Sequence, residues 1–430
     1  MRCVVARWAC AGLIWLASPS LAAQNLESPL QAETLSEAIG DGDPILLLQP
    51  RYTWVDQNGR PENARWASLR TQLGWKTLEW HDLSAVAEVI GVRHSTGGGY
   101  LEYAGSPAEA NGVGGIGVAQ GYGPGYYPLV VDPDVTDFNR LYLEYTGVPH
   151  TQLRLGRQVV RIDNQRFVGD YDSGQLPQLF NGFSAENQSL PRTRLTYAYF
   201  VRVRNPYGAQ WQTRLNLLNG RYELGSALKL AGFAYLQDQP ITGSVTGFAN
   251  NSNRILGARA WGAWPALKGV ELLYSAELAQ QRSFAGGDSR IDAPYWRFGG
   301  GLSFEHGFAR VDWERLGSNG GVYGFQTPLG SPQLFTGQAD MFASTPIRGL
   351  RDVRGTLGAE FLKAGLRLEY HVFRPDVGDW SLGHEWDLGF TWSFTREFSA
   401  TAQYADYRAG WPGAGLQDTR KVWLTLRYVY

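Results

Sequence analysis

The amino-acid sequence predicts an all-β fold, a transmembrane antiparallel up-and-down β-barrel of about 18 strands, with 16 strands as the alternative. Three observations predict it. Apolar and polar residues alternate along most of the chain, the N-terminus resembles an export signal, and the chain ends in an amphipathic aromatic stretch. Alternation with a period of two is the pattern of strands that have one apolar face.

The alternation is clearest in the C-terminal half. In 385–394, "EWDLGFTWSF", Trp386, Leu388 and Phe390 share one parity, while Asp387 and Thr391 share the other. About 17 such segments are recognisable along the chain. Because bacterial single-chain barrels have even strand numbers, we expect one further strand in the weaker stretch near 181–190.

Residues 1–23 are expected to be a signal peptide. Arg2 and Arg7 precede an apolar run that ends in small residues, which is the composition of a secretory signal. Both cysteines, Cys3 and Cys10, lie within it, so the processed chain is expected to hold neither a disulfide nor a cysteine metal site. Lipidation at Cys10 is disfavoured because Arg7 occupies a position where a lipidation motif requires an apolar residue.

The remaining chain divides into a short segment and the barrel. Residues 24–44 are expected to form a short periplasmic N-terminal segment with a loosely amphipathic helix. Residues 45–430 form the barrel, with long loops near 97–137, 163–190 and 316–352. Loops of this length within a compact domain are usually functional.

Charge excludes one class of function. Lysine and arginine total 39 and aspartate and glutamate total 40, so the formal net charge is −1. This balance argues against a general nucleic-acid binder. No segment beyond the N-terminal signal has the ~18 to 20 apolar residues of a membrane helix. An exported chain of this kind is expected in the periplasm, in the medium or in the outer membrane of a Gram-negative bacterium.

The stretch "RTRLTYAYFVRVR", residues 192–204, raises the question of which strand face meets lipid. Arginines occupy even positions, and apolar or aromatic residues occupy most odd ones. An arginine that faces lipid at the bilayer midplane costs roughly 2–4 kcal/mol. We therefore expect the even face to line a wet lumen. The chain end, "KVWLTLRYVY", alternates likewise and finishes on Tyr430, as the assembly signals of outer-membrane proteins do.

The same parity argument predicts the residues that line the pore. Acidic side chains, among them Glu144, Asp312 and Glu369, share the predicted lumen face, so some arginines are expected to form structural ion pairs. The candidates for the pore lining are Arg70, Arg154, Gln158, Arg192, Arg194, Arg202, Arg204, Arg214, Arg297, Arg310, Arg354 and Arg367.

Several stretches resemble the alginate-export-domain family of bacterial outer-membrane barrels. They are "LRLGRQVVRIDNQRFVGD" (153–170), "YGFQTPLGSPQLFTGQADMFASTPIRGLRD" (323–352), "YHVFRPDVGDWSLGHEWDLG" (370–389) and the chain end from 404. The most specific positions include Gly156, Arg157, Gln326, Asp340, Arg351 and Asp352. The resemblance implies an 18-stranded monomeric barrel whose basic lumen conducts polyanions. After "RFVGD" this chain departs from the family pattern, and Gln338 stands where many members carry tryptophan.

Other motifs favour no enzyme and no cofactor. "GVGGIG" (112–117) fits the glycine pattern of nucleotide sites, but no strand–turn–helix context surrounds it. The six histidines lack metal-ligand spacing, and no G-x-S-x-G motif occurs. Arg157 has the parity of the lipid-facing leucines, so either the strand ends there or a bulge reorients it.

The leading hypothesis is a passive outer-membrane channel, in contact with lipid, for hydrophilic and anionic solutes. The expected solutes are anionic oligo- or polysaccharides or small organic acids. One alternative is a polysaccharide secretion pore that works with periplasmic export partners. Another is an outer-membrane enzyme with an active site at the rim, built from a dispersed Ser/His/Asp set that spacing does not reveal.

Overall fold

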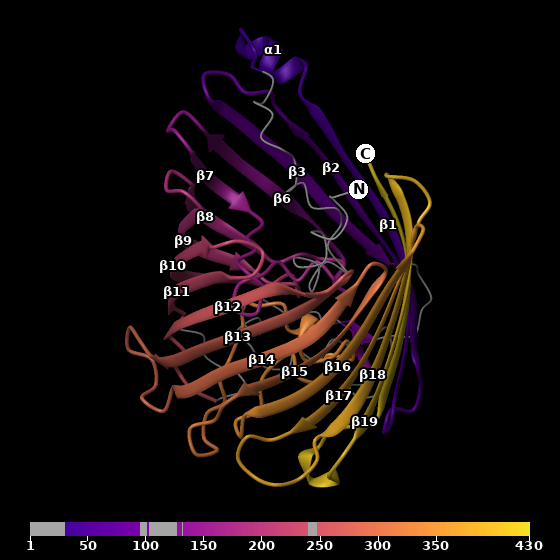
Figure 1. Cartoon of the computed structure of the whole chain (residues 1–430). Helices are drawn as coiled ribbons and strands as arrows, with labels where there is room; N and C mark the ends of the chain where they lie inside the picture. The colour runs from indigo at the N-terminus through magenta and orange to yellow at the C-terminus, as the bar shows by residue number, and fades with distance from the viewer. Residues whose placement is uncertain (1–30, 95–100, 103–126, 131, 240–246) are drawn as a thin grey trace.

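The structure, a computed structural model, describes residues 31–94, 101–102, 127–130, 132–239 and 247–430. Over these residues, 18 strands form one antiparallel sheet in which every strand has two neighbours. The sheet closes because β1 pairs with β2 on one side and with β20 on the other. Figure 1 shows the tilted strands following one another around the wall. The predicted 18-stranded barrel is confirmed.

The strands of the barrel have the following bounds: β1 (Asp43–Gln57), β2 (Ala64–Lys76), β3 (Leu83–His94), β6 (Val135–Tyr145), β7 (Thr151–Gln158), β8 (Leu179–Asn187), β9 (Thr193–Arg204), β10 (Gln210–Glu223), β11 (Lys229–Asp238), β12 (Asn253–Leu267), β13 (Val270–Ser283), β14 (Asp292–Phe304), β15 (Gly307–Leu316), β16 (Leu350–Phe361), β17 (Ala364–Arg374), β18 (Gly383–Ser393), β19 (Phe398–Ala409) and β20 (Thr419–Val429). Outside the wall lie α1 (Leu35–Gly40), the short strands β4 (Leu101–Glu102) and β5 (Leu129–Val130), and the 3₁₀ turns η4 (Pro332–Leu334) and η5 (Pro412–Ala414).

The two ends of the barrel differ in their connections. At one end the strands join through tight turns such as 268–269, 305–306 and 362–363, and here β1 begins and β20 ends. At the other end lie long connections, including 159–178 and 317–349. Outer-membrane barrels have short periplasmic turns and longer extracellular loops, so we call these the turn end and the loop end.

Strand β9 answers the question of which face meets lipid. Leu195, Tyr197 and Val201 are 42–45% exposed on the outside, whereas Ala198 and Phe200 are at most 1% exposed on the inside. Exposed aromatic side chains also lie toward both ends of the outer face, for example Trp392 and Trp386. An apolar band flanked by aromatic residues is the outer surface of a membrane barrel.

A β-bulge corrects the predicted face of the arginines in β9. Val201 has no partner in β8, because Asn181 pairs with Arg202 and Gly182 pairs with Phe200. The extra residue shifts the alternation, and the fully buried position beyond it is Val203 rather than Arg202. The prediction that all four arginines of this stretch share the lumen face is therefore wrong for Arg202, whereas Arg204 is 1% exposed and bonds the Pro177 carbonyl of the loop inside the barrel.

Two further predictions change in extent. The strand expected near 181–190 is β8, so the loop expected over 163–190 ends at residue 178. Within the segment 24–44, the described helix is the single short α1, whose N-terminus is capped by the Thr34 hydroxyl. No helix in the described ranges is long and apolar enough to cross a membrane. The motif at 112–117 lies outside the described residues.

The barrel interior is packed by two inner loops, residues 159–178 and 317–349. Phe167 of the first loop contacts the ring of Tyr295 on β14, with centroids 5.0 Å apart, and that of Phe233 on β11, at 5.2 Å. Phe325 of the second loop lies 5.8 Å from Phe167. Aromatic residues of loops and wall thus form a buried cluster across the lumen. This cluster holds the loops inside the barrel.

The orientation of the wall can be tested on β16. Leu357 is 56% exposed on the outer face, between Val353 and Phe361. Replacing Leu357 by arginine is expected to lower the free energy of unfolding from lipid vesicles by roughly 2–4 kcal/mol, because the charge would meet hydrocarbon. Urea titration of vesicle-embedded protein measures this. Leu362→Arg, in the adjacent tight turn, is the control and should change stability by about 0–1 kcal/mol.

Candidate functional site

The two inner loops are joined to each other by backbone hydrogen bonds. The Gly169 amide donates to the Leu329 carbonyl at 2.8 Å, and the Ser331 amide donates to the Gln165 carbonyl at 3.0 Å. The buried Gln178 amide adds bonds to the Leu329 and Gly169 carbonyls. Because irregular backbone inside a barrel has no sheet partners, these bonds satisfy groups that would otherwise be buried without one. The loops therefore form one unit, which we call the inner-loop pair.

Ion pairs fix this pair to the wall. Arg166 is 1% exposed and bonds Glu314 of β15 through both Nε and Nη2, at 2.7 and 3.2 Å. Asn164 donates to Glu277 of β13 at 2.8 Å. A guanidinium that bonds a carboxylate through two nitrogens has a defined geometry, so the first loop has one position against β13–β15.

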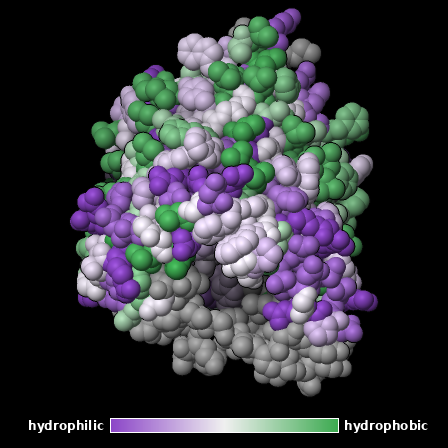
Figure 2. All heavy atoms as spheres, turned by 90° about the horizontal axis from the view of Figure 1, so that it is seen from below, coloured by the Kyte–Doolittle hydropathy of each residue, from purple (hydrophilic) through white to green (hydrophobic). Residues whose placement is uncertain are grey.

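A cavity of about 150 Å³ lies between the wall strands β10–β17 and η4 of the second loop. Arginine dominates its lining, with aspartate in the minority and the aromatic rings of Trp261 and Phe335 among the apolar side chains. The charged residues that line it are Arg221, Arg259, Arg297, Arg310, Arg354, Arg367, Asp163 and Asp312. We call it the arginine cavity. Figure 2, seen from below, shows hydrophilic residues beside a hollow and hydrophobic ones elsewhere on the surface.

Asp312 of β15 is the acidic junction of the cavity. Its carboxylate contacts Arg310 at 2.8 Å, Arg297 at 2.9 Å and Arg354 at 3.4 Å. Arg367 instead pairs with Glu369 at 2.8 Å. The structural ion pairs expected for Arg310 and Arg367 are present.

Arg259 differs from these arginines. Among the described residues it forms no ion pair within 4.0 Å, and its guanidinium lies 4.5 Å from the centroid of the Trp261 ring. Arg221 approaches the same ring at 5.1 Å and also pairs with Glu223. The ring attracts the guanidinium without supplying a negative charge, and Glu277 and Asp163 act on Arg259 only from beyond contact distance.

A second positive group lies on the opposite side of the ring of strands, on β1, β2 and β20. Arg51 bonds the Thr425 hydroxyl and the Ser173 carbonyl, and Arg427 bonds Gln49, all without a carboxylate within 4.0 Å among the described residues. Arg70 pairs with Asp172 of the first inner loop at 2.9 Å.

Asp172 sits between these charges. Burial acts to raise the pKa of its carboxyl, but the guanidinium groups of Arg70, Arg427 and Arg161 outweigh burial and hold that pKa below its usual value. The ionised carboxylate therefore ties the loop to the basic wall.

Most of the predicted lining residues face the interior. Arg70, Arg297, Arg310, Arg354 and Arg367 do so as paired side chains near the inner loops. Gln158 is buried and accepts a hydrogen bond from Ser184 at 2.7 Å. Arg154 pairs with Glu144 on β6, near the turn end.

The predicted wall of arginines around β9 does not form. Arg192 lies in the turn before β9, and Arg194 is half exposed at the turn end beside Glu186. Arg202 follows the bulge, and Arg204 is 1% exposed in a bond to Asp137. Arg214 has the outward parity of Leu218 and is 71% exposed, paired with Asp238. The prediction that Arg214 lines the lumen is wrong.

The residues singled out by the family resemblance have structural contacts. Gly156 has φ +135°, and a Cβ there would lie 2.2 Å from the Leu141 carbonyl oxygen. Arg157, one residue before β7 ends, bonds Asp137 and the Phe138 carbonyl, both at 2.8 Å. The others lie in or beside the second inner loop: Gln326 bonds the Thr345 carbonyl, Asp340 bonds Lys421, Arg351 bonds the Pro375 carbonyl, and Asp352 bonds His371.

The sequence analysis missed three arginines that face the interior, although the alternation of apolar and polar residues would have placed two of them there. Arg51 shares its parity with Gln49 and Thr53, and Arg259 shares its parity with Ile255. Arg166 lies in a loop, where no periodicity applies. The lack of a contacting carboxylate, which separates Arg51, Arg259 and Arg427 from the paired arginines, depends on neighbouring strands.

Comparison with solved structures supports the fold. OccAB2 of Acinetobacter baumannii matches with a TM-score of 0.66 over 92% of this chain and 99% of that chain, at 13% identity. OccAB1 of the same species matches with a TM-score of 0.65 over 94% and 99% of the two chains, at 12% identity. Pseudomonas aeruginosa OpdQ matches with a TM-score of 0.65 over 92% and 99%, also at 12% identity.

These likenesses extend along the whole barrel, and they concern its architecture. No protein-family description matches the sequence, and no curated protein matches it. The resemblance to the alginate-export-domain family therefore stays a prediction.

Removing the acidic junction should destabilise the barrel. Asp312→Asn would leave three interior arginines without their shared carboxylate, and breaking a buried pair in this way costs about 3–5 kcal/mol. Urea unfolding from vesicles at neutral pH measures the loss. Asp379→Asn is the control, because the Asp379 side chain is 92% exposed; its effect should stay within about 0.5 kcal/mol. Equal effects of the two substitutions would contradict the role of Asp312.

The contribution of Asp172 should depend on pH in a defined direction. Because its folded-state pKa is depressed, its stabilisation is fully present above the unfolded value of about 3.9 and is lost as pH falls through the folded pKa. Asp172→Asn should therefore be less stable than wild type at pH 7, and the gap should close at strongly acidic pH. A gap that widens on acidification would show that the sign is wrong.

Proposed function

We propose that the protein is a passive channel in the outer membrane of a Gram-negative bacterium, for hydrophilic solutes with a preference for anions. The outer face supports membrane insertion, since large hydrophobic side chains are exposed on most of the wall strands, for example Leu357 on β16 and Trp386 on β18. The observation that carries the anion preference is the set of interior arginines without a contacting carboxylate: Arg51, Arg259 and Arg427.

The physical reason is electrostatic. Positive groups on the wall of a narrow wet channel raise the local concentration of anions. The paired arginines contribute less to this field because Asp312, Glu369 and Asp172 offset part of their charge at contact distance. The three unpaired ones remain, on opposite sides of the ring. Small organic acids and acidic saccharides, alginate-like oligomers among them, fit this charge pattern.

The inner-loop pair sets the size limit of the proposed path. It is joined to both the β13–β15 wall, through Arg166, and the β1–β2 wall, through Gln175, whose amide donates to Ser68 at 2.8 Å. Solutes would pass beside this unit, so we propose narrow selectivity rather than free diffusion. Such passage follows the concentration gradient and needs no covalent chemistry.

The charge of Arg259 can be tested against a matched arginine on its own strand. A unit charge about 7 Å from an ion contributes about 0.6 kcal/mol in water, roughly a threefold change in local anion concentration. Arg259→Gln should therefore lower the anion-to-cation permeability ratio, measured from the reversal potential across a salt gradient in a planar bilayer. Arg254→Gln, which lies on the exposed outer face of β12, should leave the ratio unchanged.

Alginate oligomers added to the same bilayer test the finer proposal. Block of wild-type openings that weakens in Arg259→Gln would support an acidic saccharide as solute. Openings without block would retain the channel and remove alginate. A barrel that is folded but silent would contradict passive conduction and favour the export-pore alternative.

A further inference from the structure

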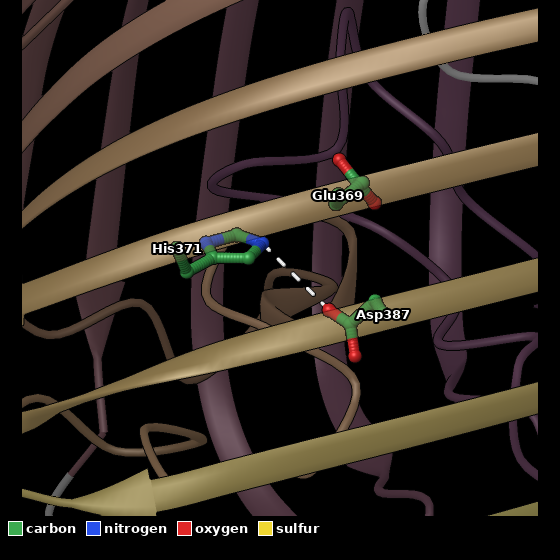
Figure 3. A group of neighbouring side chains, drawn as sticks. All are labelled: Glu369, His371 and Asp387. Atoms are coloured by element: carbon green, nitrogen blue, oxygen red, sulfur yellow. Dashed lines mark ion pairs between the residues drawn. The ribbon is translucent and has the colours of Figure 1, made fainter.

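We propose that Glu369, His371 and Asp387, on the inner wall of β17 and β18, form a binding site for one divalent transition-metal ion of the zinc type. One ligand atom from each residue lies within 4.8 Å of the other two. Figure 3 shows the His371 ring pointing at the Asp387 carboxylate across the two strands, with Glu369 further along β17.

The environment of His371 supports this assignment. Its Nδ1 lies 2.8 Å from Oδ2 of Asp352 on β16. If Nδ1 carries the proton that this bond requires, the lone pair of Nε2 is left free. A histidine that donates one ring N–H to a carboxylate and offers the other nitrogen is the usual arrangement of a metal-bound imidazole.

The other nitrogen faces a gap. His371 Nε2 is 3.7 Å from Asp387 Oδ2, which is longer than a hydrogen bond. Asp387 Oδ1 and Glu385 Oε2 are buried and accept no hydrogen bond from a donor group among the described residues, although the two carboxyl groups interact with each other; Asp352 Oδ1 is buried without a partner there as well. Buried carboxylate oxygens without a partner are costly. They mark a place where a ligand would satisfy them.

The charges of the cluster are also unbalanced. Four carboxylates lie together on β16–β18, each at most 6% exposed: Asp352, Glu369, Glu385 and Asp387. Among the described residues, the two arginines that contact them are Arg354 and Arg367, both through Glu369, and Arg354 is shared with Asp312. The nearby Lys421 is paired with Asp340 and adds no net charge. Asp352, Glu385 and Asp387 have no arginine or lysine within 4.0 Å among the described residues, so the cluster carries a negative excess that a divalent cation would reduce.

The donor set indicates which ion. An imidazole nitrogen with carboxylate oxygens suits Zn²⁺ and Mn²⁺, whereas Mg²⁺ and Ca²⁺ prefer oxygen alone. Zinc bonds to nitrogen and oxygen are about 2.0–2.2 Å, so two ligand atoms of a tetrahedral zinc ion lie about 3.4 Å apart. The observed separations require side-chain shifts of roughly 1 Å or less to close around an ion. The three buried residues offer three ligand atoms, so a fourth position of a tetrahedral ion would be left for water.

Such an ion would hold the second inner loop to the wall. Asp387 Oδ2 accepts a hydrogen bond from the Gln338 amide at 3.2 Å, and Glu385 Oε1 accepts one from the Ala339 amide at 2.7 Å. An ion on Asp387 would fix the carboxylate that receives this backbone bond. The cluster is also one side chain from the arginine cavity, because Thr356 lines that cavity and donates to Glu369 at 3.0 Å.

The test is to refold the full chain with Zn²⁺, remove free metal by gel filtration, and measure zinc per folded barrel by mass spectrometry. One equivalent is expected in wild type. His371→Gln and Asp387→Asn should each lower retained zinc at least tenfold. His384→Gln, an exposed histidine on β18, is the matched control and should retain zinc as wild type does.

Two further measurements keep the result interpretable if one variant fails to fold. Asp352→Asn should fold and bind zinc 10–100-fold more weakly, because Asp352 orients the ring without being a ligand. Cobalt(II) loaded in place of zinc should give a visible absorption band that His371→Gln abolishes.

The outcomes separate this proposal from the one on transport. Equal zinc content in wild type, His371→Gln and His384→Gln would overturn the site, as would tighter binding of Ca²⁺ than of Zn²⁺. If the zinc contents are equal, a protonated His371 that bridges Asp352 and Asp387 would explain the geometry. Anion selectivity in the bilayer rests on Arg259 and is independent of either result.

Discussion

The whole structure depends on the pairing of β1 with β20. In hydrocarbon no water is present to bond the backbone N–H and C=O groups of an open sheet edge. The register that joins Leu47 to Val429 and Gln57 to Thr419 removes both edges at once. Closure then divides every strand into a face toward lipid and a face toward the interior. The ion pairs and arginine contacts described above form because the inner face of the strands is enclosed.

Enclosure also explains why the interior is so rich in ion pairs. A charged side chain on the inner face cannot extend into bulk water when two loops fill the space. It must bond a neighbour, and the neighbour is usually on the next strand, as Arg297 is to Asp312. Where the pairing is incomplete, charged groups are available to a ligand: an anion at Arg259 and a metal ion at the carboxylates around His371, as proposed above.

The strands could be predicted from sequence because their alternation is local. Even the weak strand β8 was expected from the evenness of the strand number. The inside or outside position of a residue could be read only as far as the alternation is unbroken. The unpaired Val201 shifted it for Arg202 at the end of β9, and a bulge leaves no mark in composition.

The candidate sites were less predictable for the same reason. Glu369 and His371 are two residues apart, but Asp387 and Asp352 come from different strands, and only the register places them together. The inner loops carry no periodic pattern, so their position inside the barrel could not be deduced from their length.

The backbone bonds between the two inner loops have a mechanical consequence. Gly169 to Leu329 and Ser331 to Gln165 join segments separated by some 160 positions in the chain. Neither loop can leave the lumen alone without exposing unpaired amides of the other. Any rearrangement that moves one loop away from the wall therefore moves the other with it, and the two loops behave as one unit, rooted between β7 and β8 and between β15 and β16.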